Sequence, residues 1–267
     1  MASNESIHTF AVCAYGQSPY LRDCLDSLMS QRGVESEIYI ATSTPSAWLK
    51  EIAAEYGIPL YVNTGESGIG QDWCFAYEQA SSPYVTIAHQ DDIYLPGYAA
   101  AAVAALESDP NSLIYFCDYG ELRGSKPVDD SLLLKVKRGL LRPLANARRA
   151  ARPWAKRFAL RFGSAICCPS VTFNMARCPC PPFVVGMKSN LDWATWEVLS
   201  HLDGSFLYGS DQILMRHRIH PGSETSKLIA SHERNDEDLA MLEHFWPKPI
   251  AAFIELLYSK GTSSNEL

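Results

Sequence analysis

The chain has 267 residues, of which 47% are hydrophobic and 20% are charged, and its formal net charge is −7. These values are typical of a soluble globular protein with a sizeable core. No run of about 18 apolar residues occurs, which excludes a membrane-spanning helix. Residues 1–6 carry an acid but no Lys or Arg, so we expect no signal peptide and expect the eight cysteines to be reduced cytosolic thiols.

Strand-like and helix-like segments alternate along the first half of the chain. Apolar runs predict strands at residues 9–13, 37–41, 59–62 and 112–117, and a further strand that ends at Gln90-Asp91-Asp92. Helical spacing predicts helices at residues 20–31, 48–56, 71–80 and 98–107. This alternation predicts an α/β fold with a mainly parallel sheet and helices on both faces. In such sheets ligands bind at the carboxyl ends of the strands, where Asp91 and Asp92 fall.

Asp91 and Asp92 are the most informative pair in the sequence, because two adjacent carboxylates directly follow a buried β-branched run. Neighbouring carboxylates repel each other and lose solvation if they are buried without partners. A divalent cation removes this repulsion, and hard oxygen ligands suit Mg²⁺ or Mn²⁺ that also binds substrate phosphates. The alternative is a solvated turn with two exposed acids.

A basic segment between residues 131 and 165 holds ten Lys and Arg residues and no Asp or Glu. Leucines are interspersed among the cations, and basic amphipathic helices of this kind bind anionic membrane surfaces. We favour a membrane over nucleic acid, because no nucleic-acid recognition module surrounds the segment. The alternative is a helical hairpin that packs on the core through its leucines. The basic residues are Lys135, Lys137, Arg138, Arg142, Arg148, Arg149, Arg152, Lys156, Arg157 and Arg161.

Several motifs follow one another in a specific order. They are residues 10–17, 20–28, 65–80, Gln90-Asp91-Asp92, 166–173, 190–196 and 218–226. In this order and spacing the chain resembles a family 2 glycosyltransferase with the GT-A fold, over roughly residues 7–230. The resemblance implies a single doubly wound sheet and the inverting transfer of a sugar from a nucleotide-diphosphate donor.

The resemblance also implies roles for the acidic residues. Asp92 is expected to bind Mn²⁺ or Mg²⁺ that neutralises the donor diphosphate, and Asp91 to contact the ribose or sugar of the donor. Asp192 is the candidate general base that removes the proton of the acceptor hydroxyl. Its alternative role is the N-cap of a helix at residues 193–200. His220 is a candidate metal ligand, although a structural histidine is an equal alternative.

The remaining donor-binding residues are implied on the same basis. The expected set is Ala14, Tyr15, Thr42, Gln71 and Arg218, of which Arg218 can pair with phosphate. The chain departs from the family at residues 41–45, where an acidic residue that contacts the nucleobase is usual and none is present. A hydroxyl group can still bind a base there, so both UDP-linked and dTDP-linked donors fit this pattern.

The sequence therefore predicts one GT-A domain with four segments. Residues 1–125 form the half that binds the nucleotide sugar, 126–165 a basic helical insertion, 166–230 the acceptor half with the base, and 231–267 a C-terminal helical segment. We expect a sugar to pass to a glycan or polyprenyl-linked acceptor in cell-surface polysaccharide synthesis, on the cytoplasmic face of the plasma membrane. The alternatives are a nucleotidyltransferase and a non-catalytic membrane-surface adaptor with the same fold.

Overall fold

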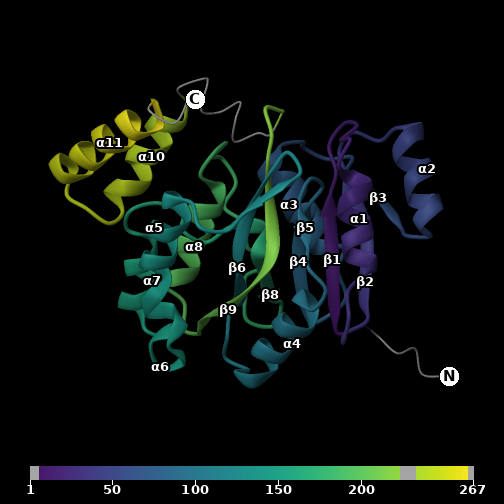
Figure 1. The fold of residues 1–267 in the computed structure, drawn as a ribbon, viewed down its shortest axis with the longest axis horizontal. Coiled ribbons are helices and arrows are strands. Elements are labelled where there is room, and N and C mark those ends of the chain that lie inside the picture. Colours follow the sequence, from purple (N-terminus) through teal and green to yellow (C-terminus); the bar gives the residue numbers. More distant parts are fainter. Residues whose placement is uncertain (1–5, 223–232, 264–267) are drawn as a thin grey trace.

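The computed structural model describes residues 6–222 and 233–263. Within these ranges one mixed sheet of nine strands has the order β3-β2-β1-β4-β8-β6-β9-β5, and β7 pairs with β6 (Figure 1). The strands are β1 (His8–Cys13), β2 (Ser36–Thr42), β3 (Leu60–Val62), β4 (Tyr84–His89), β5 (Ile93–Tyr94), β6 (Ile114–Arg123), β7 (Lys126–Val128), β8 (Val171–Asn174) and β9 (Phe206–Ile219). The α/β fold with a mainly parallel sheet is confirmed.

Helices cover the sheet and extend beyond its edge. They are α1 (Leu21–Met29), α2 (Ala47–Tyr56), α3 (Ile69–Glu78), α4 (Tyr98–Ser108), α5 (Leu132–Leu141), α6 (Ala147–Ala150), α7 (Pro153–Leu160), α8 (Leu191–Ser200), α10 (Glu233–Glu243) and α11 (Lys248–Ser263). Two short 3-10 helices, η1 (Arg142–Ala145) and η2 (Cys168–Ser170), connect these elements.

The N-terminal half of the sheet is parallel and in register. Cys13 at the end of β1 lies opposite Ala41 in β2 and His89 in β4. Parallel strands that are buried on both faces carry continuous apolar runs, and β1 is buried from His8 to Val12. The carboxyl ends of β1, β2 and β4 therefore meet at one edge, from which their loops lead into the site.

Side-chain alternation along β1 divides the core into two layers. Phe10 and Val12 pack with the buried faces of α1, α2 and α4. Ala11 belongs to the opposite layer, with residues of α3, α7 and α8, including the fully buried Trp196. Helices thus cover both faces of the sheet, as the alternating pattern of the sequence predicts.

The C-terminal half of the sheet departs from purely parallel pairing. Strand β8 is antiparallel to both β4 and β6, and β9 is parallel to β6. The short strand β5 follows Asp92 directly and pairs antiparallel with β9, which places Ile93 opposite Arg216. This register brings the end of β9 beside the paired acids at the end of β4.

The basic segment forms α5, η1, α6 and α7, which lie on the same side of the molecule as α8 (Figure 1). Its leucines are used for packing: Leu134, Leu141, Leu144 and Leu160 are buried in the core. The packing role weighed as an alternative therefore applies to the inner face of this segment.

The cations of the basic segment divide into two groups. Half of them are held within the fold or the cavity described below: Lys137, Arg138, Lys156, Arg157 and Arg161. Lys156, for example, is fully buried and donates to the carbonyls of Leu202 and Gly204 at 2.7 and 3.1 Å. The exposed group is Lys135, Arg142, Arg148, Arg149 and Arg152. Among the helices within the described ranges, none combines the length and the apolar character that a membrane span needs.

Candidate active site

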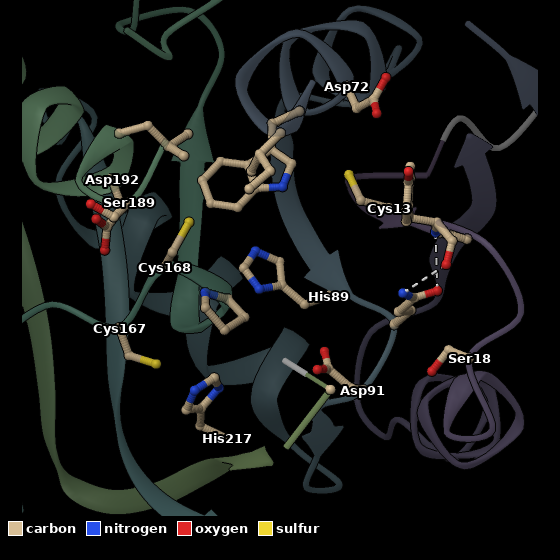
Figure 2. Close-up of a pocket in the computed structure, with 18 of the residues that line it drawn as sticks. Cys13, Ser18, Asp72, His89, Asp91, Cys167, Cys168, Ser189, Asp192 and His217 are labelled. Atoms are coloured by element: carbon tan, nitrogen blue, oxygen red, sulfur yellow. Dashed lines mark hydrogen bonds between the residues drawn. The ribbon is translucent and has the colours of Figure 1, made fainter. Parts of the chain in front are cut away.

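A cavity of about 930 Å³ opens at the carboxyl ends of β1 and β4 (Figure 2). Cys13 and Asp72 line one side, Cys167 and Asp192 line the opposite side, and Asp91 lies between them. Residues from both halves of the chain therefore face one space. Its position agrees with the rule that open α/β sheets bind ligands beyond the carboxyl ends of their strands.

The sequence-predicted site residues fall into two groups. Those that line the cavity are Ala14, Tyr15, Asp91, Asp192 and His220. Those that do not line it are the buried Thr42, Asp92 and Arg218 and the half-buried Gln71. The Thr42 hydroxyl accepts the backbone N–H of Thr44 at 3.0 Å. The Gln71 side chain folds back over Gly68, where a Cβ would lie 2.5 Å from its amide oxygen.

Asp91 and His220 form a polar pair that faces the cavity. The Oδ2 atom of Asp91 lies 2.9 Å from the Nε2 atom of His220. Arg218 supports the pair from behind, because its Nε donates to the Asp91 carbonyl at 2.8 Å and its Nη2 contacts Asp23 at 3.0 Å. The Arg218 guanidinium also lies 4.4 Å from the centre of the Tyr20 ring. A buried cation thus fixes the backbone that carries the Asp91 carboxylate.

Asp92 has no exposed surface and connects β4 to β9. Its Oδ1 accepts the backbone N–H of Arg218 at 2.9 Å and lies 3.0 Å from Nδ1 of His217. Burial by itself would raise the pKa of the Asp92 carboxyl, but His217, His89 and the Arg218 N–H lower it below its usual value. Burial would also lower the pKa of His217, whereas Asp92 and Asp91 raise it. Each member of the pair therefore favours the charged form of the other.

The residues around Asp91 fit a divalent cation that is shared with phosphate. Within the described residues no group of three or more His, Cys, Asp or Glu side chains could hold a metal ion by itself. Asp91 and His220 supply one carboxylate and one imidazole at the cavity wall. Mg²⁺ is usually bound by one or two carboxylates together with substrate phosphates and water, so this open set suits a metal–diphosphate complex. The Asp92 Oδ2 atom is buried and has no hydrogen-bond partner in the described residues.

Asp72 supplies a carboxylate close to residues 41–45, the segment in which the sequence has no acidic residue. It projects from the first turn of α3 and accepts hydrogen bonds from Ser43 Oγ at 2.6 Å and Asn63 Nδ2 at 2.8 Å. Ser43 belongs to the segment after β2 in which the expected acid is missing. The sequence does not reveal this contact, because α2 and β3 lie between that segment and α3.

Asp192 lies inside the first turn of α8, and the N-cap position is taken by Asn190. Its Oδ2 accepts the Ser164 hydroxyl at 3.0 Å, and its Oδ1 accepts the Trp193 N–H at 2.7 Å. The N-terminal end of a helix favours a negative charge. The local structure therefore holds a carboxylate at the cavity wall, and the N-cap alternative does not apply to it.

Glu237 on α10 is a contributor that the sequence does not reveal. Its carboxylate accepts the backbone N–H groups of Lys188, Ser189 and Asn190 at 2.7, 2.8 and 3.0 Å, and the Ser189 hydroxyl at 2.6 Å. Burial alone would raise the pKa of Glu237, but these donors lower it. One carboxylate thus fixes the loop that leads into α8 and Asp192. A contact over 47 residues of sequence leaves no local pattern to detect.

Comparison with known proteins identifies the family. The model of glycosyl transferase family 2 matches residues 9–149, which is more than half of the chain. The chain therefore belongs to glycosyl transferase family 2, whose members transfer a sugar from a nucleotide sugar. The two alternative functions, a nucleotidyltransferase and a non-catalytic adaptor, do not agree with this membership. Comparison with curated protein sequences gives no match.

Solved structures show the same fold at low sequence identity. The crystal structure of S. aureus TarS 1-349 in complex with UDP-GlcNAc has a TM-score of 0.62 and 16% identity, and covers 93% of this chain and 70% of that one. The mannosyltransferase PcManGT from Pyrobaculum calidifontis, in complex with GDP-Man and Mn²⁺, has a TM-score of 0.62 and 13% identity. This second likeness covers 99% of this chain and 77% of the mannosyltransferase.

Glu237→Gln is expected to lower the free energy of unfolding by about 1–2 kcal/mol at pH 7, because hydrogen bonds to a charged acceptor are weakened. The folded-state pKa of Glu237 is lowered, so its contribution is present above the ordinary glutamate value of 4.5 and is lost as pH falls through the folded pKa. Urea unfolding between pH 7 and pH 3.5 measures this. The control is Glu243→Gln on the same helix, which removes only the ion pair between Glu243 and the exposed Lys248, whose charged atoms lie 3.9 Å apart. Equal losses in both variants, or a loss that is constant with pH, would contradict the assignment.

Proposed function

We propose that the chain is an inverting glycosyltransferase that uses a UDP-linked or dTDP-linked sugar donor together with Mn²⁺ or Mg²⁺. The observation that carries this proposal is that Asp91, its partner His220 and the Asp192 carboxylate all line one cavity. Figure 2 shows Asp91 from the N-terminal half of the chain and Asp192 from the C-terminal half around this space. A donor diphosphate near Asp91 and an acceptor hydroxyl near Asp192 would then lie on opposite sides of the transferred sugar. This arrangement suits a single displacement.

The metal role is assigned to Asp91 and His220. The resemblance to the family places it on Asp92, but Asp92 is fully buried and does not line the cavity. Its Oδ1 is occupied by His217 and Arg218, and its Oδ2, which has no hydrogen-bond partner in the described residues, is not exposed. A bound divalent cation neutralises the diphosphate and makes it a better leaving group. Asp91 and His220 would hold the cation at the cavity wall, and Arg218 would keep the Asp91 backbone in place. Asp92 then has a positioning role.

Asp192 is assigned as the general base. Its carboxylate would accept the proton of the acceptor hydroxyl as that oxygen attacks the anomeric carbon and the bond to the diphosphate breaks. Ser164 and the Trp193 N–H each donate to one oxygen of the carboxylate, which fixes its direction. A fixed orientation supports proton transfer, because the acceptor oxygen must lie within hydrogen-bond reach of the base.

The membrane partner is proposed for the outer face of the basic segment. Arg142, Arg148, Arg149 and Arg152 are exposed there. Large apolar side chains are exposed on the same segment, at Leu132, Leu133, Val136 and Trp154. Exposed cations beside exposed apolar groups favour an anionic bilayer surface. We infer a glycan or polyprenyl-linked acceptor in cell-surface polysaccharide synthesis, reached from the cytoplasmic face of the membrane.

Asp91→Asn should weaken metal-dependent binding of the nucleotide sugar by at least about tenfold, because a neutral amide is a poorer ligand for a hard cation. The free energy of unfolding should stay nearly unchanged, since Asp91 is partly exposed at the cavity. Asp92→Asn should instead destabilise the fold by about 3 kcal/mol, because it leaves the His217 charge unpaired. Calorimetric titration of UDP-linked and dTDP-linked sugars with MnCl₂ or EDTA, and urea unfolding, measure the two effects. Normal binding by Asp91→Asn, with binding lost only in a stable Asp92→Asn variant, would return the metal role to Asp92.

Asp192→Asn should retain donor binding while the release of nucleoside diphosphate falls by roughly 10²–10⁴-fold, because a near-isosteric amide accepts no proton. Steady-state kinetics and donor titration separate the two quantities. Asp203→Asn, at an exposed position, serves as the control and should match the wild type. A fall of less than about tenfold in Asp192→Asn would require a different base.

Replacement of Arg148, Arg149 and Arg152 by Gln should release the chain from anionic vesicles, with about 100-fold weaker binding if each cation contributes roughly 1 kcal/mol. Co-sedimentation with vesicles of phosphatidylglycerol and phosphatidylcholine across a salt series measures this. Donor turnover should not change, because these residues lie outside the cavity.

The control for membrane binding removes the same number of exposed cations elsewhere, at Arg32, Lys50 and Lys126. It should retain vesicle binding. Equal binding to neutral and anionic vesicles, or an equal loss in both triple variants, would contradict a membrane role for the basic segment.

A further inference from the structure

Lys137 is a cation of the basic segment that does not face outwards. It lies on α5 and its side chain lines the cavity. Its Nζ donates to the Tyr119 hydroxyl at 2.9 Å, and in the described part of the chain this is its one hydrogen bond. An ammonium group carries three donors, so two N–H groups of Lys137 are available to a ligand. A partly buried cation of this kind favours an anionic partner.

The neighbouring Arg138 shows what a purely structural cation looks like in the same helix. Its guanidinium donates to Asp118 Oδ2 at 2.7 Å and to the Tyr119 carbonyl at 3.1 Å, and it also binds the Asp129 carbonyl. Lys137, in contrast, forms no ion pair with any carboxylate in the described residues. The hydrogen bonds of Arg138 are all made within the protein, whereas the charged group of Lys137 faces the cavity.

Electrostatics place Lys137 on the side of the cavity that holds the proposed base. Burial alone would lower the pKa of Lys137, but Tyr119, Cys167 and Asp192 raise it above the ordinary lysine value. Its charge in turn lowers the pKa of Cys167 relative to burial alone. Figure 2 shows Cys167 and Asp192 opposite Cys13 and Asp72, which line the far side. The charge of Lys137 also opposes the rise in the pKa of His217, which Figure 2 shows on the same side of the cavity as Cys167 and Asp192. The cavity-lining groups that interact with Lys137 thus lie on the side that holds the proposed base.

We propose that Lys137 binds a phosphate or carboxylate group of the acceptor, beside the hydroxyl that Asp192 deprotonates. This rests on the proposed function, because it takes the acceptor to enter on the Asp192 side. A charge-assisted hydrogen bond at this point orients the acceptor as well as binding it. The acceptor class is then an anionic glycan or a phosphate-containing carrier, and neutral sugars are poor acceptors.

The probes are sn-glycerol 1-phosphate and glycerol, which differ only in the phosphate group. Each is titrated by calorimetry into the full chain that has first been saturated with Mg²⁺ and a nucleoside diphosphate. Wild type should bind glycerol phosphate and not glycerol. Lys137→Met, which keeps the length of the side chain, should weaken glycerol phosphate binding by at least about tenfold, because a charged donor is lost.

Two further variants keep the test sharp. Lys137→Arg retains the charge and should restore binding, which separates loss of charge from a folding defect. Lys135→Met on the exposed face of the same helix should match wild type, since Lys135 contacts only exposed Asp130.

Three results would overturn the inference: no binding of glycerol phosphate by wild type, equal binding by Lys137→Met, or a loss in nucleoside diphosphate affinity instead, which would assign Lys137 to the donor. The first titration, of nucleoside diphosphate with Mg²⁺ into wild type, tests the proposed function separately. If that titration fails, the donor site is wrong. If it succeeds and glycerol phosphate fails, only the acceptor inference is wrong.

Discussion

The buried carboxylate of Asp92 is the contact on which the site depends. It joins the end of β4 to the end of β9 through the Arg218 N–H and His217. The β5 pairing and the contacts of Arg218 and His220 with Asp91 join the same two strand ends, but Asp92 is the fully buried member of this group. Because a carboxylate without exposure is stable only when it is paired, the sequence at this position fixes the relative place of Asp91 and His220. The buried Asp92–His217 pair thus sets the geometry of the Asp91–His220 pair at the cavity wall.

The second constraint holds the opposite side of the cavity. Asp192 stands in the first turn of α8, and Glu237 on α10 ties the preceding loop by its backbone N–H groups. The helical insertion completes this wall, because α5 presents Lys137 to the cavity while Leu134 and Leu141 pack into the core. The insertion therefore has an inner face that belongs to the site and an outer face that carries the exposed arginines. In the proposed function the inner face contacts the acceptor and the outer face contacts the membrane surface.

Local patterns predicted the fold well, since continuous apolar runs such as residues 9–13 specify buried parallel strands and paired carboxylates mark a strand end. The burial of Asp92 against β9 could not be predicted, because its contacts with His217 and the Arg218 N–H join residues more than 120 positions apart in the sequence. The sequence also does not distinguish Lys137 from the other cations of the basic segment. Which of their side chains faces the cavity depends on how α5 packs. Glu237 and Asp72 act through contacts distant in sequence.

The central claim is that β9 brings His220, and not His217, to a metal shared with the donor diphosphate. Pulsed EPR of the Mn²⁺–nucleoside diphosphate complex tests it directly, because imidazole nitrogen and phosphorus couple to the bound Mn²⁺. The account predicts both couplings in wild type, loss of the nitrogen coupling in His220→Gln, and its retention in His217→Gln. Nitrogen coupling that persists in His220→Gln, or that disappears in His217→Gln alone, would contradict the account.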